Sequence, residues 1–129
     1  MKVLIDTQCW LWLNVEPERF SLSTLVLLER PDTGRLLSVA SIWEIAIKHA
    51  IGKLELPERP AQYVPERLDT TATKTLPIED RHALRAGGLP MHHRDPFDRL
   101  IIAQAQTERV PIVTVDPKFR TYGIDIIDP

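Results

Sequence analysis

The sequence contains a single cysteine, Cys9, so no disulfide can form within its 129 residues. A lone thiol favours a reducing compartment, and we expect a cytoplasmic protein. The apolar stretch after Met1 is too short for a signal peptide, and no apolar run is long enough to cross a membrane. The chain also lacks a basic excess, because 16 Lys and Arg stand against 18 Asp and Glu. Any nucleic acid would therefore have to be bound by a local group of basic side chains.

Two patterns found in other enzyme classes are also missing. No serine or cysteine stands in a nucleophile-elbow context, and no glycine-rich phosphate-binding loop is present. What remains is an ordinary globular composition, with 43% hydrophobic and 26% charged residues. A chain of this length can bury one substantial core, so we expect a single domain over residues 1–129.

Short apolar runs alternate with helical patterns along the chain. The predicted strands are residues 2–5, 36–39, 73–76, 112–115 and 124–127. The predicted helices are residues 21–30, 41 to 49 or 51, 79–86 and 96–107, with a short helix or turn at 10–13. Three prolines predict broken helical turns rather than one helix within residues 56–68. The alternation favours an α/β fold with a mainly parallel sheet.

Four acidic residues lie where one predicted element gives way to the next. Asp6 ends the first apolar run, Glu44 lies in the first turn of a helix that begins near residue 41, Asp98 lies at the start of a later helix, and Asp116 ends the fourth apolar run. In a parallel sheet the carboxyl ends of the strands and the neighbouring helix starts face one crevice. Carboxylates gathered there repel one another unless a cation is present, and their oxygens suit Mg²⁺ or Mn²⁺. The sequence therefore predicts an acid-cluster, metal-dependent enzyme.

Each acid also has a structural interpretation. Ser41 and Glu44 match a capping box, in which Glu44 would only satisfy a backbone N–H group. Asp95 and Asp116 each precede a proline, as helix N-caps often do, and for Asp95 we favour the cap. Asp6 could cap a short helix that starts at the next residue. Caps and metal ligands can coexist, because helix starts and strand ends meet at one edge of the sheet.

Asp98 fits a purely structural role least well. The residues three, four and seven positions after it are apolar, which places it on the buried face of its own helix. A buried carboxylate without a partner is costly, and Arg94 and Arg99 project elsewhere around the helix. A metal ion is the simplest partner.

The histidines add less to the prediction. His92 and His93 could be metal ligands, but they are adjacent in an arginine-rich loop, where we expect them to be solvated. His49 and His82 stand alone in predicted helices, and we interpret both as structural.

Four segments occur in an order that points to a known family. They are VLIDT at residues 3–7, VASIWEIAIK at 39–48, HRDPFDRLIIAQA at 93–105 and VTVDPKF at 113–119. Together they resemble the PIN-domain ribonucleases, and closely the VapC-type toxins of bacterial toxin–antitoxin pairs. The resemblance spans nearly the whole chain, and residues 95–105 are its most specific part.

The resemblance implies a three-layer α/β/α sandwich with a central, mainly parallel sheet. It also implies Mg²⁺- or Mn²⁺-dependent cleavage of RNA by a toxin that a small antitoxin inhibits, and a homodimer. Carried over by position, the acidic quartet comprises Asp6, Glu44, Asp98 and Asp116, with Asp95 as an additional acid.

A metal-dependent mechanism assigns roles to these residues. Asp6 and Asp98 are the expected central metal ligands, and Glu44 and Asp116 complete the shell directly or through waters. Basic residues near the quartet in sequence could hold flanking RNA phosphates, although solvated surface charge is an equally open interpretation; they are Lys48, Arg94, Arg99 and Lys118.

Three other interpretations compete. A catalytically silent PIN-like binding module would keep the fold without the reaction. A phosphoacceptor signalling domain would need paired acids after the first strand, whereas Asp6 stands alone; an aspartyl phosphatase would need a second Asp two residues later.

Trp10, Trp12 and Trp43 lie near the site elements and are either core residues or apolar anchors for a partner.

Overall fold

The computed structural model describes residues 1–129 and is organised around a five-stranded sheet. The strand order is β3-β2-β1-β4-β5, and every neighbouring pair is parallel. The strands are β1 (Lys2–Ile5), β2 (Gly34–Ser38), β3 (Thr73–Leu76), β4 (Ile112–Val113) and β5 (Ile126–Ile127).

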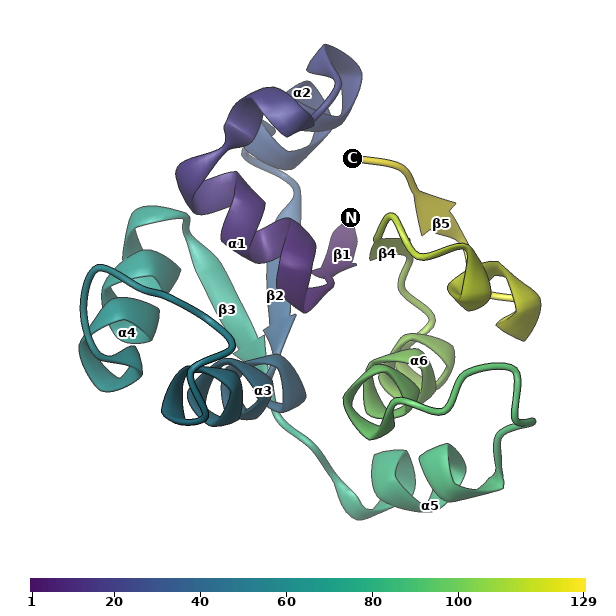
Figure 1. Cartoon of the computed structure of the whole chain (residues 1–129). Coiled ribbons are helices and arrows are strands. Elements are labelled where there is room, and N and C mark those ends of the chain that lie inside the picture. The colour runs from purple at the N-terminus through teal and green to yellow at the C-terminus, as the bar shows by residue number, and fades with distance from the viewer.

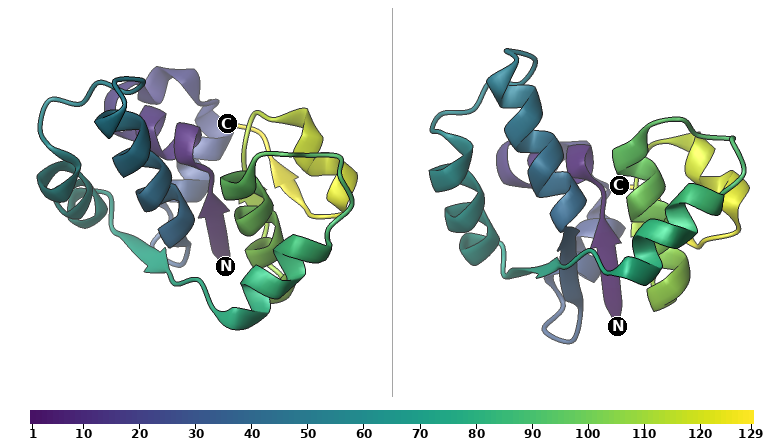
Figure 2. Two further views of the ribbon diagram at one scale, coloured as in Figure 1. Left: turned by 60° about the horizontal axis from the view of Figure 1, so that its bottom comes forward. Right: turned by 90° about the horizontal axis from the view of Figure 1, so that it is seen from below.

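Helices connect the strands and cover both sides of the sheet (Figures 1 and 2). The α-helices are α1 (Thr7–Val15), α2 (Leu22–Glu29), α3 (Val39–Ala50), α4 (Pro60–Thr70), α5 (Asp80–Gly88) and α6 (Pro96–Glu108). Two 3₁₀ helices, η1 (Pro17–Arg19) and η2 (Pro117–Tyr122), follow α1 and β4. None of the helices combines the length and the apolar composition that crossing a bilayer would require.

The central strand β1 divides the apolar core into two clusters. Val3 and Ile5 pack in one cluster with residues of α1, α2, α3 and α4, whereas Leu4 packs in the other with residues of α6 and η2. All three side chains are fully buried, as expected for a parallel strand covered on both faces. The predicted α/β/α sandwich with a parallel sheet is therefore confirmed.

The prediction of broken helical turns around the prolines is wrong, because α4 runs unbroken through Pro65. Pro60 occupies the start of the helix, where no N–H donor is needed. Pro65 leaves the carbonyl of Ala61 without its usual partner, but both residues are exposed and water can hydrate that group. Tyr63 and Val64 are buried and hold the helix against the first core cluster.

The remaining elements agree with the sequence in kind and differ at their ends. The predicted short helix or turn at 10–13 is a longer helix, α1, and the fourth and fifth strands are shorter than expected. The second strand begins earlier and stops at Ser38, so α3 begins at Val39 rather than near residue 41. This last shift changes the position of Glu44 within its helix.

Candidate functional site

Asp6 joins strand β1 to helix α1 and is almost fully buried. Its Oδ1 accepts a 2.7 Å hydrogen bond from the backbone N–H of Cys9, so the expected helix cap is confirmed. Its Oδ2 accepts a hydrogen bond from the hydroxyl of Thr114, just beyond β4. Burial raises the pKa of Asp6, although these hydrogen bonds oppose the shift.

Glu44 lies in the second turn of α3, and the capping-box interpretation is wrong. Ser38 is the N-cap instead, accepting a 3.0 Å hydrogen bond from the N–H of Ala40. The buried Glu44 carboxylate turns toward α1, where Thr7 donates its hydroxyl to Oε1 at 2.6 Å. Lys48 Nζ lies 2.6 Å from Oε2. Glu44 is thus fixed by side chains rather than by a helix end.

Asp95 and Asp98 lie at the start of α6. Asp95 is the N-cap, and its Oδ1 accepts a 3.0 Å hydrogen bond from the N–H of Asp98. The pKa of Asp98 is raised to about 8, chiefly by burial and then by the negative charges of neighbouring acids, first Asp95 and then Glu44. Burial and the neighbouring negative charges thus both favour the protonated form of Asp98.

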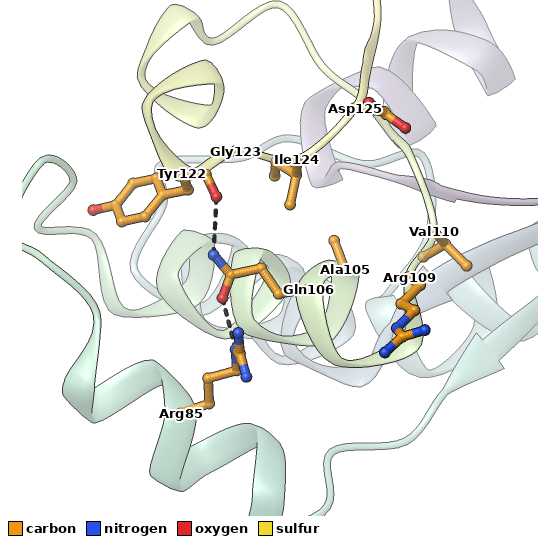
Figure 3. Close-up of a pocket in the computed structure, with 9 residues that line it drawn as sticks. All are labelled: Arg85, Ala105, Gln106, Arg109, Val110, Tyr122, Gly123, Ile124 and Asp125. Atoms are coloured by element: carbon orange, nitrogen blue, oxygen red, sulfur yellow. Dashed lines mark hydrogen bonds between the residues drawn. The ribbon is translucent and has the colours of Figure 1, made fainter.

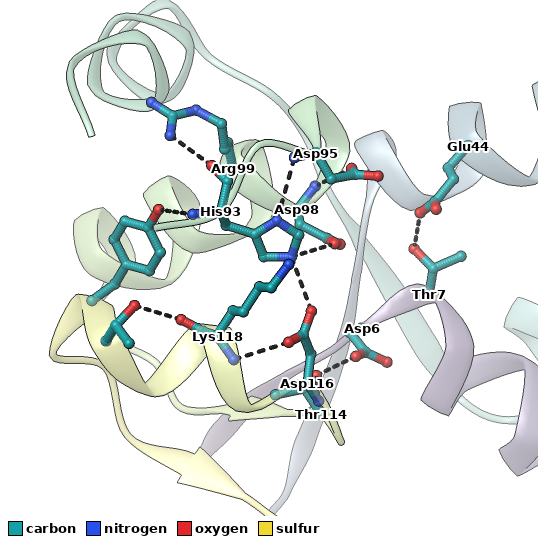
Figure 4. A network of polar contacts seen from close by, with 12 residues as sticks. Asp6, Thr7, Glu44, His93, Asp95, Asp98, Arg99, Thr114, Asp116 and Lys118 are labelled. Atoms are coloured by element: carbon teal, nitrogen blue, oxygen red, sulfur yellow. Dashed lines mark hydrogen bonds and ion pairs between the residues drawn. The ribbon is translucent and has the colours of Figure 1, made fainter. Parts of the chain in front are cut away.

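Asp116 follows β4 and caps η2 by accepting a 2.9 Å hydrogen bond from the N–H of Lys118. Its other carboxylate oxygen, Oδ2, lies 2.9 Å from Nε2 of His93. The same ring nitrogen lies 2.9 Å from Oδ2 of Asp98 (Figure 4). A single histidine therefore links two acids that come from different elements.

The expectation that His92 and His93 are solvated is wrong for His93, which is buried, and holds for His92, which is exposed. The sequence does not show which of two adjacent histidines points inward, because this depends on the loop that carries them. His93 is therefore a site residue that the sequence offered only as a less favoured alternative.

Arg99 is not available to hold a phosphate, which corrects the sequence-based expectation for this residue. The buried guanidinium donates four hydrogen bonds of 2.8 or 3.0 Å to backbone carbonyls of Ala86, Leu89, Pro90 and His93. These bonds hold the loop between α5 and α6 against the first turn of α6. Arg94 and Lys118 are exposed, and neither lines the acidic pocket.

The predicted acids converge on one pocket of about 200 Å³ at the carboxyl edge of the sheet. Lys48 is the one basic residue in its lining, and the hydrogen bond to Glu44 raises the pKa of Lys48. The lining residues are Asp6, Thr7, Gln8, Glu44, Lys48, Asp95, Asp98, Val115, Asp116 and Phe119.

The donor set of this pocket fits a hard divalent cation. Five carboxylates face a single lysine and the ring of His93. Mg²⁺ and Mn²⁺ prefer carboxylate oxygens, and a cation would relieve the mutual repulsion that contributes to the raised pKa of Asp98. Ligand atoms of His93, Asp98 and Asp116 lie within 4.8 Å of one another.

A second histidine, His82, lies beside carboxylates between α5 and α6, but its contacts stabilise the ends of these helices. His82 Nδ1 accepts the N–H of Glu79 at 3.0 Å, and its Nε2 lies 3.0 Å from Glu108 Oε1. The guanidinium of Arg81 contacts both Glu79 and Glu108. The structural interpretation of His82 agrees with these contacts, and Arg81 already supplies the positive charge that a cation would bring.

A larger hollow of about 390 Å³ lies beside α5, α6 and the residues after η2 (Figure 3). Gln106 connects its sides by accepting from Arg85 at 2.7 Å and donating to the carbonyl of Tyr122 at 3.0 Å. Asp125 is its only carboxylate, and it shares no lining residue with the acidic pocket. It therefore offers no comparable set of metal ligands.

The chain thus combines an α/β/α sandwich with acids at the carboxyl edge of its sheet. The family model described as "PIN domain" matches residues 3–124, and the chain belongs to this family. Within the family the chain is similar to Ribonuclease VapC16 of Mycobacterium tuberculosis (strain ATCC 25618 / H37Rv), with 47% identity over 57 residues. That match covers 43% of this chain and 40% of the relative, so the chain spans less than half the length of the relative it matches.

Solved structures share the fold along nearly the whole chain. VapBC2 from Rickettsia felis, bound to a DNA fragment from its promoter, gives a TM-score of 0.73 at 16% identity and covers 98% of each chain. DNA-bound VapBC from Salmonella typhimurium gives 0.71 at 20% identity, covering 99% of this chain and 98% of that one. A toxin–antitoxin complex from Klebsiella pneumoniae gives 0.67 at 17% identity, covering 98% and 97%. At these identities the likeness shows the fold alone.

Proposed function

We propose that this chain is a metal-dependent endoribonuclease that hydrolyses RNA phosphodiester bonds, with residues 1–129 acting as one nuclease domain. The observation that carries the proposal is the convergence of five carboxylates from four separate segments on one pocket. Membership of the PIN family and the similarity to a protein named as a ribonuclease support the same reaction.

The acids divide into ligands and a cap. Asp6 and Asp98 are the central metal ligands, while Glu44 and Asp116 complete the shell directly or through waters. A bound Mg²⁺ or Mn²⁺ would neutralise the pocket, polarise a phosphate oxygen and lower the pKa of an attacking water. Asp95 holds the first turn of α6 and thereby the position of Asp98.

Basic side chains hold the RNA beside the acids. Lys48 is the innermost, because it lines the pocket while its ammonium pairs with Glu44. The exposed Arg94 and Lys118 contact flanking phosphates, which fix the position of the chain without reading its sequence. Arg99 has no part in this contact, since its guanidinium is taken up by backbone carbonyls.

The biological role we propose is that of a toxin in a toxin–antitoxin pair, acting on RNA in the cytoplasm as a homodimer and inhibited by a small antitoxin. The solved structures with this fold include complexes described as VapBC and toxin–antitoxin complexes. Trp43 is 57% exposed and packs edge-on against Phe97, one residue away from Glu44 and Asp98 respectively. This aromatic pair is an apolar anchor for the antitoxin beside the acids. Trp10, in contrast, is fully buried core.

The test of the reaction is cleavage of RNA by the purified protein, with Mn²⁺ or with EDTA. We expect cleavage with Mn²⁺ and none with EDTA. A folded wild-type protein that binds Mn²⁺ and leaves RNA intact would instead favour the silent PIN-like module.

The toxin role has a separate test in a host that carries no cognate antitoxin. Expression of the wild-type chain should slow growth, and co-expression of the cognate antitoxin should restore it. Asp98→Asn should remove the growth effect and keep antitoxin binding, because the aromatic anchor is unchanged. Normal growth on expression of the wild-type chain would count against the toxin role.

A further inference from the structure

We propose that His93 is a positioning residue, which sets the separation of Asp98 and Asp116 for a divalent cation. The inference rests on the proposed function and deepens it, because it assigns a residue that organises the metal-binding acids. Asp98 belongs to α6, and Asp116 lies beyond β4. Their carboxylates repel each other, so a donor between them is needed to keep both turned toward the pocket.

The hydrogen bonds of the ring determine which nitrogen donates. The N–H of Asp95 points to His93 Nδ1 at 3.3 Å, so Nδ1 acts as the acceptor. A neutral imidazole with an accepting Nδ1 carries its proton on Nε2. Nε2 lies 2.9 Å from Oδ2 of Asp98 and 2.9 Å from Oδ2 of Asp116. Nε2 therefore donates its proton to Asp116, stands 2.9 Å from Oδ2 of Asp98, and does not present a free lone pair to a metal.

The surrounding structure fixes this ring in place. The N–H of His93 donates to the hydroxyl of Tyr122 at 2.7 Å, and that hydroxyl donates to the carbonyl of Pro90 at 2.7 Å. Arg99 donates to the carbonyl of His93 at 3.0 Å (Figure 4). The ring packs edge-on against Phe119, with 5.7 Å between the ring centroids. The backbone on both sides of His93 and the ring itself are thus anchored.

This anchoring gives Arg99 a place in the site without contact to RNA. Its four bonds to carbonyls hold the whole turn from Ala86 to His93 against α6. Arg99, which follows Asp98 in the sequence, therefore holds the loop that places His93 beside Asp98. Residues that orient metal ligands through hydrogen bonds commonly change metal affinity by about 10–100-fold when they are lost.

The test is calorimetric titration of the full chain with Mn²⁺, which reads metal affinity without RNA cleavage. We expect His93→Ala to bind Mn²⁺ about 10–100-fold more weakly than wild type. His93→Gln keeps an N–H donor on a side chain of similar reach and should recover part of that loss. His49→Ala is the matched control, because His49 lies on α3 outside the lining of the acidic pocket, and its affinity should equal that of wild type.

A second measurement separates positioning from direct ligation. Electron spin echo spectroscopy of the Mn²⁺-bound wild type should show no nitrogen coupled as a direct ligand. Such a coupling, lost in His93→Ala, would overturn the inference and make His93 a ligand. Unchanged Mn²⁺ affinity in a folded His93→Ala protein would overturn it as well.

A third variant decides the matter if His93→Ala does not fold. Tyr122→Phe keeps the ring and removes only the hydroxyl that anchors His93, and we expect it to weaken Mn²⁺ binding measurably; wild-type affinity would overturn the inference.

The outcome is separable from that of the proposed function. Weakened Mn²⁺ binding without any RNA cleavage by wild type would overturn the ribonuclease alone, whereas cleavage with unaltered Mn²⁺ affinity in the variants would overturn the positioning role alone. Absence of Mn²⁺ binding by wild type would overturn both.

Discussion

Two groups in this molecule bring one histidine together with two carboxylates, and they differ in what balances their charge. In one, His82 meets Glu79 and Glu108, and the guanidinium of Arg81 contacts both acids. In the other, His93 meets Asp98 and Asp116, and three further acids line the same pocket with a single lysine. Ligand spacing alone would class both as metal sites. The balance of charge separates them, because Arg81 bridges both acids of the first group, whereas five acids share one lysine in the second.

The largest expected effect comes from removing one acid of the unbalanced group. Asp98→Asn should abolish RNA cleavage while the protein stays folded and becomes slightly more stable, because one source of repulsion is gone. Glu108→Gln is the matched change in the balanced group and should leave cleavage intact. Cleavage assays with thermal unfolding measure both. Loss of cooperative unfolding in Asp98→Asn would show that this acid is structural.

Metal binding should separate the two groups by stability. A ligand that binds only the folded state adds RT ln(1 + [L]/Kd) to the free energy of unfolding, so millimolar Mn²⁺ should raise the melting temperature of wild type. Mg²⁺ should act in the same direction with no larger shift, since divalent affinity at such sites follows that order. The shift should shrink in Asp98→Asn and persist in Glu108→Gln. An equal shift in both variants would place the cation elsewhere.

The pH dependence of stability should also come from the unbalanced group. In EDTA, folded Asp98 has a pKa of about 8 and the unfolded chain an ordinary value near 3.8, so the folded protein holds a proton that the unfolded chain has released. This contribution to the free energy of unfolding is complete below about pH 4 and is lost as pH rises through about 8. Urea unfolding at several pH values should show a decline that is smaller in Asp98→Asn. A decline of the same size in that variant would assign the effect to other groups.

The smallest effect is expected at the helix cap. Asp95→Ala removes the hydrogen bond from the N–H of Asp98 and should lower the free energy of unfolding by about 1 kcal/mol. We expect this variant to lose only part of its RNA cleavage. Urea unfolding and RNA cleavage measure the two losses. Complete loss of cleavage at unchanged stability would make Asp95 a direct ligand rather than a cap.

Local patterns were enough to predict the sheet and the positions of the acids. An apolar run followed by an acid places Asp6 directly after β1 and Asp116 shortly after β4, at the same edge of the sheet. The start of α3 was harder, because Ser38 and Ser41 are both acceptable caps and only the end of β2 decides between them. Pro65 was misread because the cost of a missing hydrogen bond depends on whether water reaches the unpaired carbonyl.

The two largest errors share one physical cause. The sequence around His93 and Arg99 is polar and charged, which is typical of a solvated loop. The structure instead folds that loop around the arginine, whose planar guanidinium matches several carbonyls at once. Such a loop is specified by contacts between residues up to 32 positions apart in the chain, so no periodic pattern records it.

Asp6 has a structural role as well as its proposed role in the pocket, so substitutions of Asp6 and of Asp98 should differ in their effect on protein abundance. Its carboxylate closes the first turn of α1 and receives the hydroxyl of Thr114, whereas the carboxylate of Asp98 caps no helix. Where selection favours loss of activity, a substitution at Asp98 can remove the activity while the folded protein is still produced in quantity. Most changes at Asp6 would also fray a helix and lower abundance, with asparagine, itself a good cap, as the exception. Inactive but abundant variants should therefore arise at Asp98 more often than at Asp6.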